Sequence, residues 1–406
     1  IIKHSNKIFK SKKQLIITIC IVSVLFALII PYTSTDVYSY IANGWSASYY
    51  HENPYYKSVG QVSDEYQVKD QMQNKVANCW RYETVVYGPL WTLICKLLTS
   101  ISFGNIDVAL AIFKGTNLIV HLINSILIWK ITHKKKLVLI YGTNPAILFE
   151  ALSNVHNDIF IVLFILLAVY FVTKKKNLIL SVAFVAMATA IKYLGILILP
   201  FIILYHLRGK NILEKIKYCV LYGLEFIVIL VGFYAIYVRD LNIFAGLFIQ
   251  QSKYNRSIML VFYYLIGEQS TNILKTALLV VFAILYVYTV IKLLLNNNTK
   301  IFSSYIREYS TLLYIFTFIL ITNFNSWYIL WLFPTLMFLN GKNIRLIINL
   351  SYTVEVAYIG SFALYSEAQN LGVLYIFLVA IVTGILTSMP MVKNKVEHLS
   401  NKIEIR

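Results

Sequence analysis

The residue types best suited to chemistry lie where apolar runs of the chain end. Asp36 follows the apolar run 14–31 and lies in the Tyr-rich segment PYTSTDVYSYIANGWSASYYHENPYY, residues 31–56. A carboxylate at this position could act as a general base that takes a proton from a hydroxyl group. It could also meet an aqueous reactant and a membrane-held reactant together. The same position also suits a solvated loop residue with no chemical role.

Other polar and aromatic side chains lie at the ends of later apolar runs. Ionisable groups at membrane depth are costly and often mark functional sites. Acids and bases gathered on one face of a membrane would suit an anionic, lipid-linked substrate. The candidates are His156, Asn157 and Asp158 in SNVHND, Lys192 in IKYLG, Lys253, Asn255 and Arg256 in QQSKYNRSIM, and Trp327 and Tyr328 in NFNSWYILW.

Each candidate has a structural alternative. Asn157 and Asp158 could accept hydrogen bonds from the free N–H groups of a helix start. Lys192 could extend to lipid phosphates, KYNR could be an interfacial basic patch, and the Tyr and Trp side chains could form an aromatic belt. For ionisable groups inside the apolar runs we expect pairing between helices; these are Lys114, His121, Glu225 and Glu355.

The composition indicates an all-α, polytopic integral membrane protein. The 406 residues are 59% hydrophobic and only 13% charged, whereas soluble domains carry about 25% charged residues. Apolar runs recur along the chain, and a helix needs about 20 apolar residues to cross a bilayer. The net charge of +18 comes from Lys and Arg clustered between these runs, as the positive-inside rule requires. We therefore expect membrane lipids and no nucleic acid as partners.

The basic clusters predict about twelve spans with both termini in the cytoplasm. If every cluster lies inside, 25 of the 36 Lys and Arg are cytoplasmic and 10 lie outside. The basic arm precedes a full-length apolar run, so we expect no cleavable signal. The predicted spans are 14–31, 106–131, 137–151, 157–173, 177–191, 193–207, 217–238, 273–295, 309–322, 327–340, 346–365 and 371–390.

We expect one membrane domain, 1–406, with outer loops at 32–105 and 239–272. The apolar segment 87–103 is predicted to be an interfacial or re-entrant helix, because a crossing there would move every later basic cluster outside. Two pairs of short spans, 137–151 with 157–173 and 177–191 with 193–207, have outer hinges at or below the interface. Irregular backbone at that depth lines a cavity or is buried in protein.

Motifs of soluble enzymes are absent from the sequence. It contains no H-E-x-x-H, Walker A, G-x-S-x-G or zinc-site spacing. We expect no cofactor and leave a metal requirement open. The cysteines are far apart; we expect free thiols, with Cys79 and Cys95 as the only conceivable pair.

Five short motifs occur in order along the chain: STDVYSYIANGWSASYYHENPYY, YGPLW (87–91), NPAILFEALSNVHND (144–158), TAIKYLGILILP (189–200) and NSWYILWLFP (325–334). Together they resemble the GT-C membrane glycosyltransferases, and most closely the polyprenol-phosphate-mannose-dependent mannosyltransferase branch. The resemblance covers residues 14 to about 340. It departs at Glu52, where Gly usually precedes Asn-Pro, and at Val155, where a small residue is common.

The resemblance implies an inverting glycosyltransferase on the outer face of a bacterial cell membrane. The donor would be a polyprenyl-phosphate sugar, with mannose favoured, and the acceptor a hydroxyl of a glycolipid or cell-surface polymer. Asp36 matches the general base. The developing phosphate charge would fall to Lys192 and Arg256, with Lys253 behind them. Sugar or acceptor contacts would come from His156, Asn157, Asp158, Tyr87 and Trp327.

Two other classes of protein remain open on the sequence. A polymerase or ligase of polyprenyl-pyrophosphate glycans would need several strong outer Arg residues to bind a pyrophosphate. The outer loops hold only Arg81, Arg239 and Arg256. A flippase or transporter of lipid-linked sugars would often carry inverted repeats, and none is evident.

Overall fold

The computed structural model describes residues 11–67, 70–251, 253–296, 301–336, 341–363 and the single position 382. Within these ranges the regular structure is helical, apart from one isolated bridge between Asn255 and Asn323, which confirms the all-α class. In chain order the elements are α2 (Lys12–Leu28), α3 (Asp36–Ser48), α4 (Val59–Tyr66), α5 (Gln71–Asn74), α6 (Asn78–Arg81), α7 (Pro89–Ser100), α8 (Ile106–Thr132), α9 (Lys135–Gly142), α10 (Pro145–Ile147), η2 (Leu148–Ser153), α11 (Asp158–Tyr170), η3 (Phe171–Lys175), α12 (Leu178–Ile191), η4 (Tyr193–Ile198), α13 (Leu199–His206), α14 (Ile212–Tyr234), η5 (Leu241–Phe244), α15 (Ala245–Gln251), α16 (Ile258–Leu295), α17 (Phe302–Ile315), η6 (Phe316–Leu320), η7 (Ser326–Leu332), α18 (Phe333–Leu336) and α19 (Gly341–Ala363).

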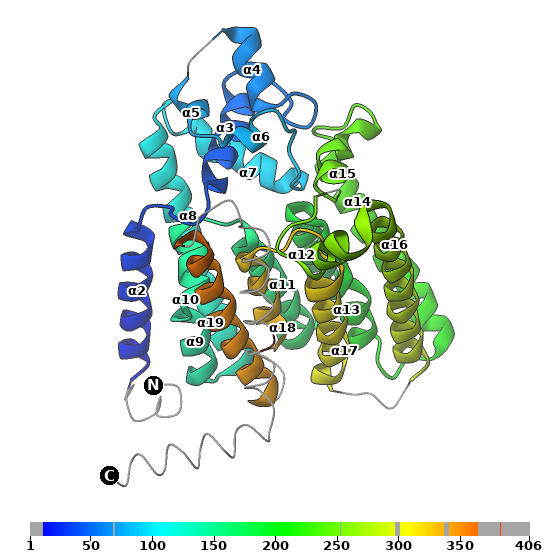
Figure 1. Ribbon diagram of the computed structural model, residues 1–406. Coiled ribbons are helices and arrows are strands. Elements are labelled where there is room, and N and C mark those ends of the chain that lie inside the picture. Colours follow the sequence, from blue (N-terminus) through cyan, green and yellow to red (C-terminus); the bar gives the residue numbers. More distant parts are fainter. Residues whose placement is uncertain are drawn as a thin grey trace.

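The helices form a bundle with a smaller head at one end (Figure 1). The head is residues 36–105 and contains α3 to α7. Helices α3 and α7 pack backbone to backbone: a Cβ on Gly44 would lie 2.5 Å from the carbonyl oxygen of Cys95. Helix α7 has 12 residues, about 18 Å at ~1.5 Å per residue, which is too short to cross a bilayer core of ~30 Å. The interfacial placement of 87–103 stays a prediction.

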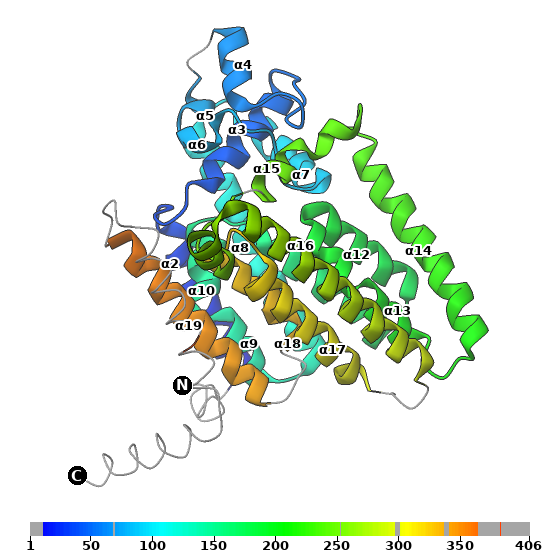
Figure 2. The ribbon, with the colours of Figure 1, turned by 45° about the vertical axis from the view of Figure 1, so that its right-hand side comes forward.

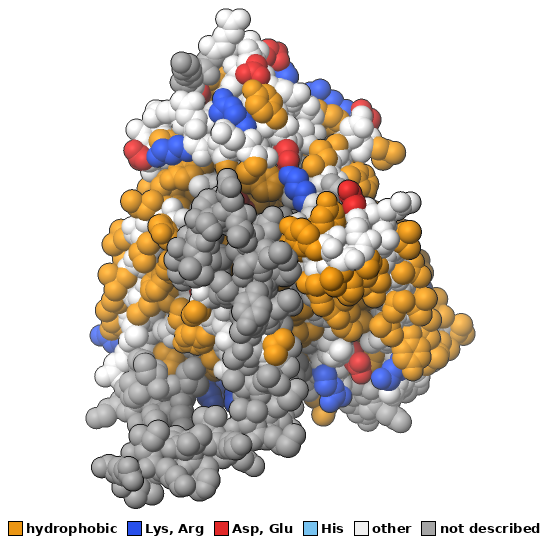
Figure 3. All heavy atoms as spheres, in the orientation of Figure 1, with side chains coloured by type: hydrophobic (Ala, Val, Ile, Leu, Met, Phe, Trp, Pro, Cys, Tyr) orange, Lys and Arg blue, Asp and Glu red, His pale blue; other side chains and the backbone are white. Residues whose placement is uncertain are grey.

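The outside of the bundle is suited to lipid. In the described part of the chain, α8, α14 and α16 are long and apolar enough to cross a membrane, and a bent pair, Pro145–Ser153 with Asp158–Lys175, could be a fourth crossing. Figure 3 shows hydrophobic side chains over the sides of the bundle, while charged side chains gather on the head and at the opposite edge. A membrane protein with several spans is therefore confirmed, and the number of twelve stays a prediction.

The centre of the bundle consists of short, interrupted helices. The predicted span 137–151 is interrupted, because α9 ends at Gly142 and a new helix begins at Pro145. There the Asn144 side chain accepts hydrogen bonds from the N–H groups of Ala146 and Ile147 and starts a new helix. Pro145 has no N–H to continue the preceding helix. The predicted segments 177–191 and 193–207 correspond to α12 and to η4 with α13, separated at Lys192.

Helix α16 begins earlier than predicted. It starts at Ile258, inside the expected outer loop 239–272, and bends at Gly267, where φ is 77°. Only a residue without a Cβ adopts that backbone easily. The helix therefore extends the apolar surface of the bundle toward the head.

The two ends of the bundle carry different chemistry. The basic segment 208–217 joins α13 to α14, and Lys292 lies in the last turn of α16; both are at the end opposite the head (Figures 1 and 2). This agrees with the clustering used to predict the topology. The four cysteines are free, with Cys95 buried and Cys79 exposed, as expected. The predicted span 371–390 and both terminal segments lie outside the described residues.

Candidate active site

Asp36 is the first residue of α3 and lies where the head meets the bundle (Figure 1). Its side chain is 18% exposed, so the carboxylate is accessible but flanked by protein. The Tyr87 hydroxyl donates to Asp36 Oδ2 at 3.3 Å, and the Tyr40 hydroxyl donates to the Tyr87 oxygen at 3.3 Å. The start of a helix also favours a negative charge. The structure thus places Asp36 in a polar cluster and not in an isolated solvated loop.

Tyr87 reaches Asp36 because the start of α7 is held against the end of α12. The Gly88 N–H donates to the carbonyl of Ile191 at 2.9 Å. A Cβ on Gly88 would lie 2.3 Å from the carbonyl oxygen of Ala190, so only glycine fits this approach. Burial and the nearby Asp36 carboxylate raise the pKa of Tyr87 well above its usual value. The phenol therefore keeps its proton and remains a donor to Asp36.

The hinge, residues 153–157, bends the chain by 115° between η2 and α11. Val155 has a φ of 63°, a left-handed conformation that is costly for a β-branched residue. His156, Asn157 and Asp158 follow it and are fully buried. Asn157 makes no capping hydrogen bond, and neither of its side-chain polar atoms has a partner in the described part of the chain. Helix capping therefore does not explain Asn157, whose amide is buried without a hydrogen-bond partner among the described residues.

Asp158 and Lys192 form an ion pair beneath the head. Lys192 Nζ lies 2.7 Å from Asp158 Oδ1, and the Trp331 indole N–H donates to the same oxygen. The rings of Tyr87, Tyr328 and Trp331 lie 5.1–5.6 Å from the ammonium. Lys192 is therefore turned toward the protein, which disfavours the structural alternative that it extends to lipid phosphates.

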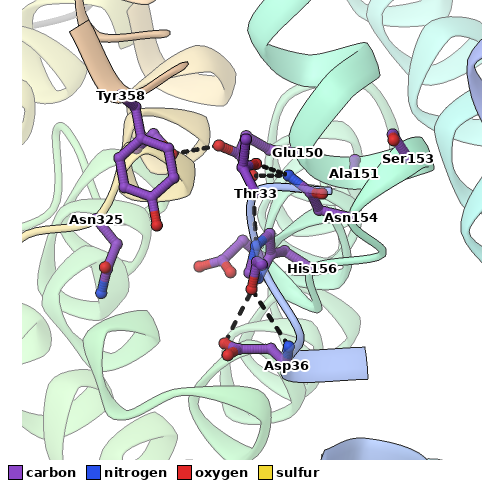
Figure 4. Close-up of polar contacts among 12 residues, drawn as sticks. Thr33, Asp36, Glu150, Ala151, Ser153, Asn154, His156, Asn325 and Tyr358 are labelled. Carbon is purple, nitrogen blue, oxygen red and sulfur yellow. Dashed lines mark hydrogen bonds and ion pairs between the residues drawn. The ribbon is translucent and has the colours of Figure 1, made fainter. Parts of the chain in front are cut away.

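His156 lies between Asp36 and a second acid, Glu150 (Figure 4). Its Nδ1 is 3.8 Å from Asp36 Oδ2, and its Nε2 is 3.3 Å from Glu150 Oε2. The imidazole stacks on the Trp327 ring, with centroids 3.7 Å apart and an interplanar angle of 19°. One face of Trp327 is thus occupied by protein, so Trp327 positions His156.

Arg256 lies on the same side of the bundle as Lys192. It donates to the Asn325 side-chain oxygen at 3.3 Å and to the Tyr358 hydroxyl at 3.0 Å. Asn325 in turn donates to the hydroxyl of Tyr328 at 3.4 Å, and the Tyr328 ring flanks Lys192. A chain of polar contacts therefore connects the two predicted phosphate-binding cations.

Lys253 does not join this cluster. It pairs with Glu83 of the head and lies 4.5 Å from the centre of the Trp80 ring. Arg256, three residues later, has a φ of 48°, and this turn separates the two side chains. Lys253 therefore holds the segment before α16 to the head, and no contact among the described residues places it beside Asp36.

The first half of the sequence carries a family match. Residues 2–208 match the MptA_B family, described as alpha-(1->6)-mannopyranosyltransferase, N-terminal domain. That range is just over half of the chain. The chain belongs to this family. The match confirms the resemblance found in the sequence motifs.

A curated relative of this mannopyranosyltransferase-family chain is alpha-(1->6)-mannopyranosyltransferase A of Mycobacterium tuberculosis (strain ATCC 25618 / H37Rv). The two are 27% identical over 192 residues, which is 45% of this chain and 36% of the relative. The chain therefore spans about a third of that relative's length. The family range includes Asp36, Tyr87, the hinge and Lys192, whereas Arg256 and Trp327 lie beyond it.

Glu150 is an acid of the site that was not among the residues predicted from the sequence. Glu150 is fully buried in η2. The Ser326 hydroxyl donates to its Oε1, and the Asn154 amide donates to its Oε2 at 2.9 Å. Glu355 of α19 lies beside it, 5% exposed. The available signal was an acid inside an apolar run, six residues before His156.

An ionisable side chain inside the bundle also forms hydrogen bonds with backbone carbonyl groups. Lys114, expected to pair with another helix, donates to the carbonyls of Ile29, Leu152 and Ser153 at 2.7–3.2 Å. It thereby joins the end of α2 to the hinge. Among the described residues, no group of three or more His, Cys, Asp and Glu side chains is arranged to hold a metal ion.

Proposed function

We propose that the chain is an inverting mannosyltransferase that moves mannose from a polyprenyl-phosphate-linked donor to a hydroxyl of an extracytoplasmic glycolipid or cell-surface polymer. The supporting observation is the position of Asp36. Its partly exposed carboxylate lies where the polar head meets the apolar bundle. The side chain of Tyr87 contacts both Asp36 and Lys192. A donor held in the membrane by its lipid and an acceptor reached from the aqueous side would meet at this point.

The chemistry requires a base and a cation, and the site offers both. Asp36 takes the proton of the acceptor hydroxyl as that oxygen attacks the anomeric carbon. The bond from this carbon to the phosphate oxygen breaks, and the lipid phosphate leaves with the electron pair. Inversion follows because the acceptor attacks from the face opposite the leaving group. Lys192 stabilises the negative charge that develops on the phosphate, and Arg256 is the second candidate for this role.

Lys192 can serve the phosphate without losing its partner. An ammonium has three N–H donors, and Asp158 occupies one of them. Asp158 Oδ2 and both polar atoms of the Asn157 amide are buried without partners in the described part of the chain. We assign these to sugar hydroxyls, because a sugar supplies both donors and acceptors.

We place the head and Asp36 on the outer side of a bacterial cell membrane. The basic ends of α13, α14 and α16 lie opposite the head (Figures 1 and 2), and positive residues favour the cytoplasm. A lipid-linked donor suits the outer side, where nucleotide sugars are absent. Both termini would then be cytoplasmic.

The arginines disfavour use of a pyrophosphate-linked donor. Arg81 donates to the Gln73 carbonyl and the Ser63 hydroxyl, and the Arg239 guanidinium lies over the ring of Tyr56. Of the three outer arginines, Arg256 alone connects to the Lys192 cluster. A polymerase or ligase that binds pyrophosphate would need more cationic groups there.

Asp36→Asn tests the proposal directly. The amide keeps the size of the side chain but cannot take a proton, so we expect transfer to fall at least ~10²-fold, the lower end of general-base catalysis. Transfer is measured in detergent with a synthetic polyprenyl-phosphate mannose donor, and donor binding is measured separately. Donor binding should persist.

Asp107→Asn is the matched control. Asp107 also lies in the first turn of a helix, α8, but is exposed, and its variant should transfer normally. Near-normal transfer by Asp36→Asn would reject Asp36 as the base. A flippase would also tolerate the change, and it would release no sugar in the assay with either variant.

A further inference from the structure

The imidazole of His156 is buried between two acids and is not used by the mechanism above. Its side chain is 0% exposed, and neither ring nitrogen makes a hydrogen bond within the described part of the chain. Yet Nδ1 faces Asp36 at 3.8 Å and Nε2 faces Glu150 at 3.3 Å. A buried, unpaired polar group is costly, and here both nitrogens are aimed at carboxylates.

The ring is held in this orientation from several sides. Trp327 stacks on one face at 3.7 Å. The His156 backbone N–H donates to the Glu150 carbonyl at 2.9 Å, and the Asn117 side chain donates to the His156 carbonyl at 3.2 Å. The imidazole can therefore move only a short way between its two acids.

Glu150 is fixed in turn. Ser326 donates to Oε1 and Asn154 to Oε2, so the carboxylate cannot rotate away from the imidazole. The titratable groups beside this line include Asp36 from α3, Glu150 from η2 and Glu355 from α19. The hydroxyl of Tyr87 donates to Asp36, and Tyr358 of α19 also lies close to both acids. Figure 4 shows Glu150, His156 and Asp36 in one row.

We infer that His156 and Glu150 are positioning residues that form a proton relay behind Asp36, an inference that rests on the proposed function. A slight turn of the ring would let Nε2–H donate to Glu150, which lies 3.3 Å away, and would leave the lone pair of Nδ1 directed at Asp36. His156 would therefore act on the general base Asp36, whereas the sequence predicted a contact with the sugar or acceptor.

The relay moves one proton in two steps. Asp36 gains the acceptor's proton when the new glycosidic bond forms, and then passes a proton to Nδ1 of His156. The products are the glycoside, the lipid phosphate with one additional negative charge, an ionised Asp36 and an imidazolium. The imidazolium lies between two carboxylates, which stabilise its charge. Opening of the site then returns the proton to solvent or to the departing phosphate.

The separation from Asp36 has to shorten for this transfer. Catalytic hydrogen bonds are often long without substrate and tighten only in the complex. Asp36 lies at the start of α3, immediately after the irregular segment 29–35, and a small movement of the start of α3 would close the distance. Glu150 and His156 belong to the bundle and stay in place.

Glu150→Gln tests the relay. The amide keeps the size and can still accept the Ser326 hydroxyl, but it carries no charge to stabilise the imidazolium. We expect kcat to fall roughly tenfold or more while KM for the donor stays within about threefold, the signature of a group that acts in the transition state. The matched control is Glu225→Gln, an acid of α14 in the same bundle, which should retain the kcat of the unaltered protein.

Chemical rescue separates the relay from a structural role. His156→Ala leaves a space of imidazole size beside Trp327, and added imidazole should restore transfer by about tenfold. His156→Ala combined with Glu150→Gln should show no such recovery. Thermal unfolding in detergent is measured for each variant, so that loss of the fold is recognised.

The outcomes distinguish the relay from the proposed function. A normal kcat for Glu150→Gln, or an absence of rescue in a folded His156→Ala protein, overturns the relay and leaves Asp36 as an unaided base. Normal transfer by Asp36→Asn would instead remove the proposed function itself. Rescue by imidazole together with an inactive, folded Asp36→Asn variant supports both.

Discussion

At the residue scale, the two carboxylate oxygens of Asp158 differ in their hydrogen-bond partners. Its Oδ1 binds both Lys192 and the Trp331 indole, and its Oδ2 has no partner in the described residues. The neighbouring Asn157 leaves its whole amide unpartnered. Buried polar groups are almost always hydrogen-bonded in native proteins, so these exceptions indicate where a sugar would supply the missing partners.

Lys192 provides a test in which stability and donor use can be separated. Lys192→Met keeps the apolar stem and removes the charge, so the KM for the donor should rise about tenfold, because hydrogen bonds to charged groups contribute about 1.5–3 kcal/mol. Stability should also fall by about 3–5 kcal/mol, because the change leaves Asp158 buried without its cation. Donor kinetics and thermal unfolding are both measured.

The double variant Lys192→Met with Asp158→Asn should recover much of that stability and none of the donor use. Lys174→Met is the control, since Lys174 is exposed and lies in the basic cluster 174–176, which the predicted topology places on the cytoplasmic side. A Lys192→Met protein with unchanged donor kinetics would limit this residue to its structural ion pair.

At the element scale, interruptions of helices position the site. The hinge turns α11 away from η2, the break at Lys192 ends α12, and the start of α7 touches that break through Gly88. Each interruption leaves backbone groups that need partners, and each lies against another element of the bundle or head. Irregular backbone at this depth survives because protein surrounds it.

Gly88→Ala tests the contact between α7 and α12. The added methyl group would overlap the Ala190 carbonyl, so the chain must move, at a cost of about 1–3 kcal/mol for overpacking. Tyr87 would shift away from Asp36 with it, and transfer should fall as well as the melting temperature. Gly115→Ala is the matched control because nothing lies within 4 Å of its Cβ position. Equal melting temperatures for the two variants would contradict the proposed contact.

The sequence predicted the interruptions better than it predicted the partners across them. SNVHND and IKYLG could be recognised as hinges because short apolar runs flank them. Asp36 could be recognised as a candidate base because it follows the apolar run 14–31. The contact between Asp36 and Tyr87 joins residues 51 positions apart, which no local pattern encodes. Glu150 lies within the motif NPAILFEALSNVHND but was not among the predicted site residues, since its contact with His156 depends on the left-handed turn at Val155. Lys253 and Arg256 are neighbours in sequence, yet the backbone turn at Arg256 sends them to different partners.

At the scale of the whole molecule, the head and the bundle differ in the polarity of their surfaces. The bundle presents an apolar exterior, with strongly exposed side chains such as Val228 and Val231 on α14 and Ile273 and Ile284 on α16. The head carries mixed charges (Figure 3). Helix α3, whose first residue is Asp36, begins where the head meets the bundle (Figure 1). A reaction between a membrane lipid and a water-exposed acceptor needs such a boundary, because neither reactant enters the other's phase.

Labelling of cysteines from outside intact cells tests the orientation of this boundary. The native Cys79 lies in the head and is exposed, so a membrane-impermeant maleimide should modify it, whereas the buried Cys95 should be spared.

In a Cys79→Ser background, a cysteine introduced at the exposed position Lys136 should react only after the cells are opened. The physical reason is the charge bias: Lys134 to Lys136 form one of the clusters that the positive-inside rule assigns to the cytoplasm. Labelling of position 136 in intact cells would place the basic end outside and would make the segment 87–103 a true crossing. Protection of Cys79 in intact cells and its labelling in opened cells would place the head in the cytoplasm, where a lipid-linked donor would have no advantage over a nucleotide sugar.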